Sequence, residues 1–167
     1  MFTGNTATQV IPHKHGHIIA NVHQAGKAEI AAACQAAIDA QDAWINMGLE
    51  ARCAIFERCA ELLAGDWRMK VNASTMLNQS KTAFQAEIDS ACELIDFWNF
   101  NCFYARQFHD MYQPLVSPAG VTNSTEIRPL EGFVLAITPF NFSSIAANLP
   151  LSLIHISEPT RPLYISY

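Results

Sequence analysis

Asn141 is the residue whose type and position point most directly to chemistry. It follows the apolar run Phe133–Ile137, which has the length and β-branched content of an interior strand in a parallel sheet, with helices on both faces. Pro139 has no N–H to donate to a neighbouring strand, so the strand should end before it. Ligands gather at the carboxyl ends of such strands. An amide in this turn can stabilise the oxyanion that develops in acyl-transfer chemistry.

The same residue has a plainer interpretation as a structural cap. Asn is a common N-cap, and Ser143 and Ser144 also offer hydroxyl caps for a helix that begins after this turn. The residues alone therefore leave two roles open for Asn141, an oxyanion donor and a helix cap.

Three carboxylates, Asp89, Glu93 and Asp96, have the spacing that places them on one face of an α-helix. The ordinary interpretation is a solvated acidic stripe. The alternative is a site for a cationic substrate group, because opposite charges stabilise each other's ionised forms.

Two other patterns are weaker evidence, one for a metal site and one for a phosphate-binding loop. His13, His15 and His17 alternate, so on a strand they would share one face as metal ligands, but no Cys or carboxylate accompanies them, and we expect no metal site. The tripeptide Ser80–Thr82 matches the end of a phosphate-binding loop. The glycines that such a loop needs upstream are absent, which argues against this function.

The composition is that of a globular protein. Half of the 167 residues are hydrophobic, 15% are charged, and the formal net charge is −5. We find no basic stripe that would indicate a nucleic-acid partner and no apolar run of about 18 residues that would indicate a membrane span. No targeting segment is visible. The five cysteines form no Cys-x-x-Cys pair, which favours reduced, buried thiols.

The elements that must position these residues are mostly helices. Helical periodicity predicts helices over Lys27–Met47, Leu49–Ala64, Trp67–Asn78 and Phe84–Met111. Alternating segments at Gly16–Gln24 and Thr122–Arg128 predict strands, the second exposed or used in oligomerisation. The order of the elements predicts a helix-rich α/β fold whose parallel sheet is left incomplete at Pro150.

Two long motifs carry a resemblance to a known family. Ala136–Phe142, with the sequence Ala-Ile-Thr-Pro-Phe-Asn-Phe, resembles the first nucleotide-fold strand and turn of the aldehyde dehydrogenases. The upstream segment Gln85–Asn101 is similar to one branch, the delta-1-pyrroline-5-carboxylate dehydrogenases, also called glutamate semialdehyde dehydrogenases. The resemblance runs from about Gln9 to Pro150. It implies that residues 1–150 are a partial NAD-binding domain.

The resemblance also implies a reaction and roles for individual residues. In this branch a cysteine thiolate attacks glutamate semialdehyde, hydride passes to NAD, and a glutamate base helps to hydrolyse the thioester. Asn141 matches the asparagine that stabilises the hemithioacetal oxyanion. The resemblance places Ile137, Thr138, Pro139 and Phe140 at the cofactor, Glu93 at the amino-acid end of the substrate, and Phe142 in the wall of the aldehyde pocket.

The catalytic cysteine and glutamate have no counterpart in this chain, so we expect the fragment itself to be inactive. Cys92 and Cys102 lie on an apolar helical stripe and are predicted to be core residues. The resemblance further implies a homo-oligomer in the mitochondrial matrix, with a small amino-acid aldehyde as substrate. Two alternatives stay open: an aldehyde dehydrogenase of other specificity, and a truncated partner that binds full-length subunits through Thr122–Arg128.

The sequence departs from the branch at two places. Ser80 and the pair Ala146–Ala147 replace residues that are usually glycine, which we expect to crowd the backbone near the site. After Pro150 the resemblance ends. Leu151–Arg161 matches, codon by codon, the in-frame translation of a transposase-type sequencing adapter, so residues 151–167 are expected to be an adapter-derived tail. A natural divergent C-terminus is the alternative.

Overall fold

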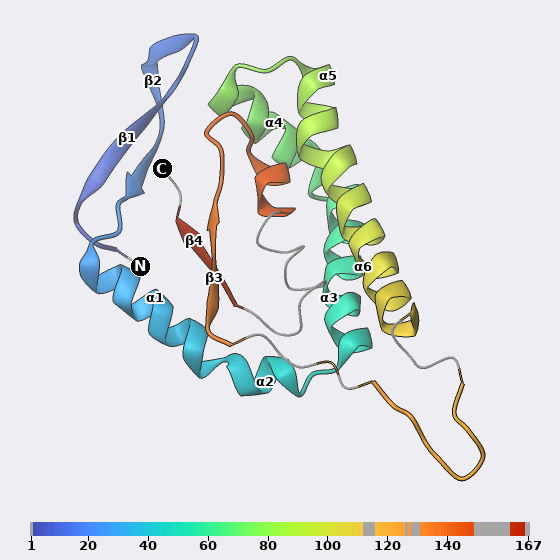
Figure 1. The fold of residues 1–167 in the computed structure, drawn as a ribbon. Helices are drawn as coiled ribbons and strands as arrows, with labels where there is room; N and C mark the ends of the chain where they lie inside the picture. The colour runs from blue at the N-terminus through green and yellow to red at the C-terminus, as the bar shows by residue number, and fades with distance from the viewer. Residues whose placement is uncertain (1, 112–115, 126, 128–130, 149–160, 166–167) are drawn as a thin grey trace.

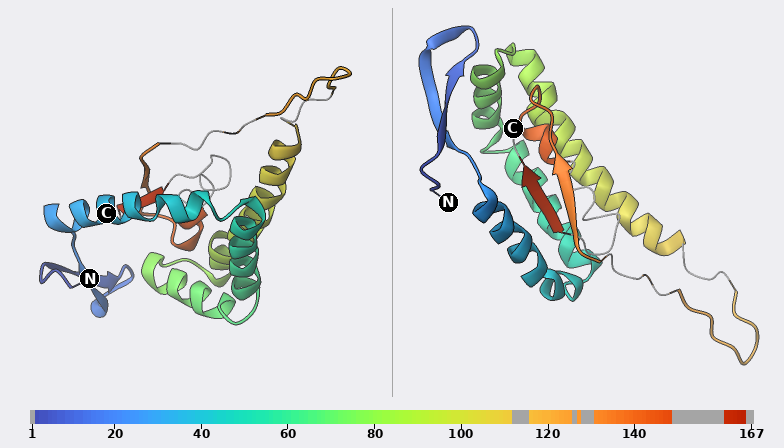
Figure 2. Two further views of the ribbon diagram at one scale, coloured as in Figure 1. Left: turned by 90° about the horizontal axis from the view of Figure 1, so that it is seen from below. Right: turned by 60° about the vertical axis from the view of Figure 1, so that its left-hand side comes forward.

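The computed structural model describes residues 2–111, 116–125, 127, 131–148 and 161–165. These residues form the helix-rich α/β arrangement that the sequence predicts, with a β-hairpin at the N-terminus and a short parallel sheet that lies between helices (Figures 1 and 2). None of the described helices is both long and apolar enough to cross a membrane.

The N-terminal hairpin consists of β1 (Thr6–Ile11) and β2 (Lys14–His23), which pair antiparallel. The sequence predicted only the second strand, and it placed the start at Gly16. The sequence does not predict β1, because the side chains from Thr6 to Gln9 are exposed and the strand carries no regular alternation of apolar and polar residues.

The first predicted helix is two helices, α1 (Lys27–Asp39) and α2 (Gln41–Ile45). Ala40 separates them with φ −81° and ψ −6°, a backbone conformation outside the regular α-helix. No Gly or Pro marks the break, so the periodicity continues through it. α1 runs beside the parallel sheet (Figure 1).

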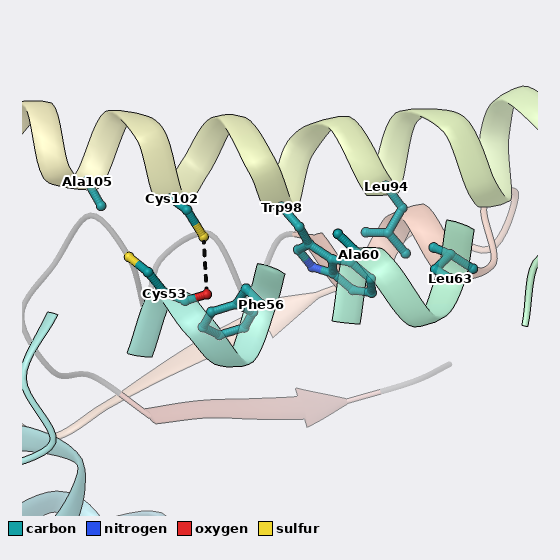
Figure 3. Close-up of a cluster of buried hydrophobic side chains, with 8 residues drawn as sticks. All are labelled: Cys53, Phe56, Ala60, Leu63, Leu94, Trp98, Cys102 and Ala105. Atoms are coloured by element: carbon teal, nitrogen blue, oxygen red, sulfur yellow. Dashed lines mark hydrogen bonds between the residues drawn. The ribbon is translucent and has the colours of Figure 1, made fainter. Parts of the chain in front are cut away.

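The core lies between α3 (Leu49–Ala64) and α6 (Glu93–Met111). The bounds of α3 are those predicted. Apolar side chains at helical spacing on the two helices face one another: Cys53, Phe56, Ala60, Leu63, Leu94, Trp98, Cys102 and Ala105 (Figure 3). At the edge of this core, Arg106 of α6 pairs with Glu50 and Glu57 of α3, with nitrogen–oxygen distances of 2.9 and 2.6 Å. The two helices are thus joined by an apolar seam with a charged clamp.

The fourth predicted helix is one helical run of three parts. It begins as α5 (Ala83–Ala86), widens into the π-helical segment η1 (Glu87–Cys92) and continues as α6. Thr82 caps its start, because the hydroxyl accepts from the N–H of Gln85 at 3.3 Å. At the end of η1 the N–H of Glu93 donates to the carbonyl of Ile88, five residues back. The third predicted helix is α4 (Arg68–Gln79), displaced by one residue from the prediction.

The strand β3 (Phe133–Ile137) has the predicted bounds and pairs in parallel with β4 (Arg161–Ile165). The expectation that helices bury both of its faces is wrong for the described residues. Phe133, Leu135 and Ile137 are exposed, whereas Ala136 between them is buried. One face of β3 is therefore open. The described residues of the predicted strand 122–128 are in no regular element, and residues 126 and 128 lie outside the described ranges.

Candidate functional site

Asn141 lies in the turn that follows β3, as predicted, and is exposed. The turn rests on the region where α4 ends and α5 begins. Lys81, in the loop between those helices, donates a hydrogen bond from Nζ to the backbone carbonyl of Asn141 at 2.9 Å. Gln79, the last residue of α4, lies near the same turn, with Nε2 3.5 Å from the carbonyl of Phe140. Asn141, the candidate oxyanion donor, is thus held in place through the backbone carbonyls of the turn rather than through its side chain.

The ammonium group of Lys81 has two further contacts. Its Nζ lies 2.5 Å from Oδ2 of Asp89 in η1 and 4.5 Å from the centre of the Phe142 ring. Asp89 is half-buried and paired, so it is not part of an exposed acidic stripe, whereas Glu93 and Asp96 are exposed. The predicted face of three carboxylates assumed α-helical spacing, and the π-helical turns of η1 change that spacing.

The two serines after Phe142 have a different role from the one predicted. The short 3-10 helix η2 (Ser144–Ala147) has Ser143 as its N-cap, but neither hydroxyl serves as the cap. The Ser143 hydroxyl instead bonds the hydroxyl of Thr75 on α4. The Ser144 hydroxyl donates to the backbone carbonyl of Ser90 at 2.7 Å. These bonds fix the turn to α4 and η1 rather than start a helix, and they argue against Asn141 as the cap of η2.

A polar cluster below the turn was not predicted from sequence. Arg68 donates from Nε to Oε1 of Glu87 at 2.7 Å, and Asn72 donates to the other oxygen. These bonds, with that of Arg68 as the main cause, lower the pKa of Glu87 to about 2. Asn72 also accepts from the Ser90 hydroxyl at 2.8 Å. The cluster connects α4 to the π-helical segment whose Ser90 carbonyl anchors the turn.

The other predicted site residues lie around this turn. Thr138 is half-buried, Pro139 is exposed, and the apolar side chains of Ile137 and Phe140 are 58% and 92% exposed. Phe142 is half-buried against Lys81, and Glu93 is the first residue of α6, next to η1. The structure therefore gathers Asn141 and Phe142 with Lys81 and Asp89. It leaves the apolar residues expected at the cofactor facing outward.

A pocket of about 300 Å³ adjoins the turn on its other side. It lies between α4 and the two serines, and its lining includes Lys70, whose Nζ is 4.8 Å from the centre of the Trp67 ring. Among the described residues there is no group of three or more His, Cys, Asp or Glu side chains that could hold a metal ion. His13, in the hairpin turn, contacts Ser80 instead.

Comparisons with known proteins identify a family. The aldehyde dehydrogenase family model matches residues 2–152. The delta-1-pyrroline-5-carboxylate dehydrogenase of Agaricus bisporus is 43% identical over 89% of this chain and 27% of that protein. The mitochondrial enzyme of that name from Homo sapiens is 44% identical over 89% of this chain and 26% of that protein. The chain thus spans about a quarter of the curated relatives it matches.

Solved structures agree with these relatives. The delta-pyrroline-5-carboxylate dehydrogenase of Mycobacterium tuberculosis bound with NAD has a TM-score of 0.87 and 47% identity, covering 98% of this chain and 30% of that chain. An NADP-dependent glyceraldehyde-3-phosphate dehydrogenase of Bacillus halodurans has a TM-score of 0.65 at 19% identity, covering 95% of this chain and 33% of that chain, a likeness of fold alone.

Proposed function

Since this chain belongs to the aldehyde dehydrogenase family, we propose that it is part of an NAD-dependent enzyme that oxidises L-glutamate gamma-semialdehyde to glutamate in proline catabolism. The observation that carries the proposal is the turn after β3, where Lys81 contacts both Asn141 and Phe142, in a chain 47% identical to an NAD-bound relative. Curated relatives named mitochondrial support a mitochondrial location for the complete enzyme.

The end of β3 fits a dinucleotide cofactor. Ile137 and Phe140 present exposed apolar surface beside Thr138 and Pro139, at the carboxyl end of β3, and ligands of α/β sheets bind at the carboxyl ends of strands. NAD, when bound, supplies the acceptor for the hydride. The four residues would form the apolar wall that receives the nicotinamide part and keeps water away from it.

Asn141 would stabilise the negative charge on the substrate oxygen. An amide donor that is already in place needs no reorganisation as charge develops, and such a donor typically contributes about 10²–10³ in rate. The contact between Lys81 and the Asn141 carbonyl supports this role, because it anchors the backbone from which the amide projects.

Glu93 and Phe142 would select the substrate. Glutamate semialdehyde carries an ammonium group, which a carboxylate at Glu93 attracts. Phe142 would offer an aromatic wall to the carbon chain of the aldehyde. Glu93 is exposed at the start of α6, so it is free to meet a ligand from outside the described helices.

The cysteine nucleophile would come from another part of the complete enzyme. Cys102 is buried, and burial raises the pKa of its thiol to about 12, which disfavours the thiolate that attack on an aldehyde requires. Burial, and then the Glu87 carboxylate, also raise the pKa of Cys92. We therefore propose that the 167-residue chain alone is inactive.

Residues 151–167 are proposed to be adapter-derived. The end of the family match at residue 152 supports this. In the complete enzyme a natural strand would then take the place that Arg161–Ile165 holds beside β3. Sequencing the transcript past the codon for Pro150 tests the proposal, and a transcript that encodes Leu151–Tyr167 followed by a stop would overturn it.

The function is tested with the complete enzyme that carries residues 1–150. We expect NAD-dependent oxidation of glutamate semialdehyde, and we expect Asn141→Ala to lower kcat about 10²–10³-fold. The 167-residue chain, assayed in parallel, should show no turnover. A complete enzyme that oxidises only other aldehydes would favour the alternative specificity. The second alternative, a non-catalytic partner that binds through Thr122–Arg128, would instead copurify with full-length subunits without changing their substrate range.

A further inference from the structure

Lys81 occupies an unusual place in the chain. It lies between Ser80, the C-cap of α4, and Thr82, the N-cap of α5, so its positive charge is beside the N-terminus of a helical run. The dipole of that run disfavours a cation there, whereas the dipole of α4, which ends at Gln79, favours one, so the two helix dipoles oppose each other at Lys81. The contacts of the side chain are therefore a better guide to the role of this lysine than its place between the helices.

The contacts of Lys81 all lead to the turn after β3. Its Nζ donates to the Asn141 carbonyl at 2.9 Å and lies 4.5 Å from the centre of the Phe142 ring. Asp89, 2.5 Å away, supplies the compensating charge. The side chains of Lys81 and Asp89 are only 17% and 22% exposed. A pair shielded from solvent in this way holds a fixed geometry better than an exposed pair on long, mobile side chains.

We propose that Lys81 is a positioning residue for the oxyanion donor, and that Asp89 holds Lys81 in place. The inference rests on the proposed function of Asn141. Lys81 acts on the backbone of residue 141 and on the ring of residue 142, so it sets where the Asn141 amide projects and how the Phe142 wall stands. It does not itself touch the reacting oxygen.

The position of the amide matters because misplacement of a catalytic group by about 1 Å can cost about 10²-fold in rate. Loss of the Lys81 contact would free the Asn141 carbonyl to move. The bonds of Ser143 and Ser144 to Thr75 and Ser90 would still hold the far side of the turn. The expected result is a site that is still assembled and still binds ligands but aligns the amide poorly.

The experiment uses the complete enzyme. We expect Lys81→Met to lower kcat about 10- to 100-fold while KM for NAD stays near the wild-type value, because the contact aligns a reacting group rather than binding the cofactor. Lys81→Arg, which keeps a donor and a charge, should recover part of the loss. Lys27→Met, an exposed lysine at the start of α1, is the matched control and should leave kcat unchanged.

A double-mutant cycle separates positioning from mere stabilisation. Asp89→Asn should lower kcat less than Lys81→Met, and the double variant should be no slower than Lys81→Met alone, because the aspartate acts through the lysine. Losses that multiply would overturn the proposal. So would a wild-type kcat in Lys81→Met, or a fall in thermal midpoint with kcat per folded enzyme unchanged. If Lys81→Met does not fold, Lys81→Arg and Asp89→Asn carry the same test.

Failure of the proposed function is seen separately, in the wild-type enzyme. If it oxidises another aldehyde instead of glutamate semialdehyde, the cycle is measured with that aldehyde, since an oxyanion forms with any aldehyde substrate. A positive result then supports the role of Lys81 while the substrate assignment fails.

Discussion

The hydroxyl of Ser80 lies 2.7 Å from Nδ1 of His13, so the turn of the N-terminal hairpin is joined to the end of α4. Ser80 has φ 52° and ψ 35°, and among the described residues it is the single non-glycine with a positive φ. This explains why a glycine suits the position. The expected crowding by Ser80 is better described as left-handed backbone strain, which costs a residue with a Cβ about 1 kcal/mol or more.

Substitutions at Ser80 test that strain. Ser80→Gly and Ser80→Ala both remove the bond to His13, so they differ mainly in backbone preference. The glycine variant is expected to be more stable than the alanine variant by about 1 kcal/mol in free energy of unfolding. Urea denaturation of the two variants measures the difference. Equal midpoints would show that position 80 is not strained.

The Arg68–Glu87 pair predicts a pH dependence. The pKa of Glu87 falls from 4.5 to about 2 in the folded chain, with the bond from Arg68 as the main cause. A depressed carboxyl pKa contributes stability above pH 4.5 that is lost as the pH falls toward 2. At pH 6 we expect wild type to have a higher urea midpoint than Glu87→Gln. The difference between the two midpoints should shrink as the pH falls from 4.5 to about 2. A gap that stays constant from pH 6 to 2 would argue against the pair.

The buried thiols should resist modification. Cys53 and Cys102 are fully buried, and the Cys102 thiol donates to the Cys53 carbonyl at 3.6 Å (Figure 3). Burial raises the pKa of both thiols. Because the thiolate is the reactive form, iodoacetamide at pH 8 should label partly buried Cys34 and Cys59 before these two. Mass spectrometry of peptides from native and urea-unfolded protein gives the order, and early labelling of Cys102 would contradict the core assignment.

Glu93 should affect one class of substrate. In the complete enzyme, Glu93→Ala is expected to lower kcat/KM for glutamate semialdehyde about 2- to 5-fold, the size of one solvent-accessible ion pair with the ammonium group. Simple aliphatic aldehydes should be little affected. Asp96→Ala, three residues along α6, is the matched acidic control. Equal losses on both kinds of aldehyde would remove the basis for the substrate proposal.

Regular periodicity explains which parts of the fold could be predicted. α3 repeats an apolar stripe between two glycines, and β3 is a short apolar run that ends before a proline, so both were placed with the right bounds. β1 has no such pattern, and the break at Ala40 has no Gly or Pro to mark it. The π-helical segment consists of ordinary helix-forming residues.

The candidate site was predictable only in part, for a related reason. Asn141 is predictable because a polar residue after an apolar strand is visible in sequence. The contact of Lys81 is not, because its acceptor is a backbone carbonyl, which has no sequence signature, and the sequence around it matches only the end of a phosphate loop. For the same reason the sequence predicts Ser143 and Ser144 as helix caps, whereas their partners, the Thr75 hydroxyl and the Ser90 carbonyl, lie far away in the chain.

The π-helical segment η1 sets how α5 is rotated relative to α6, and so it links the packing of α6 on α3 to the contact of Asp89 with Lys81. A π-helical residue turns the chain by less than the roughly 100° of an α-helical residue, so the six residues of η1 turn it by about as much as five α-helical residues. If residues 87–92 all became α-helical, α5 would therefore rotate against α6 by about 100°, and either Leu94 and Trp98 would leave the seam with α3 or Asp89 would swing away from Lys81. A single-residue deletion in the middle of α6, where no wider turn absorbs the change of register, should therefore be tolerated less well than one within 87–92.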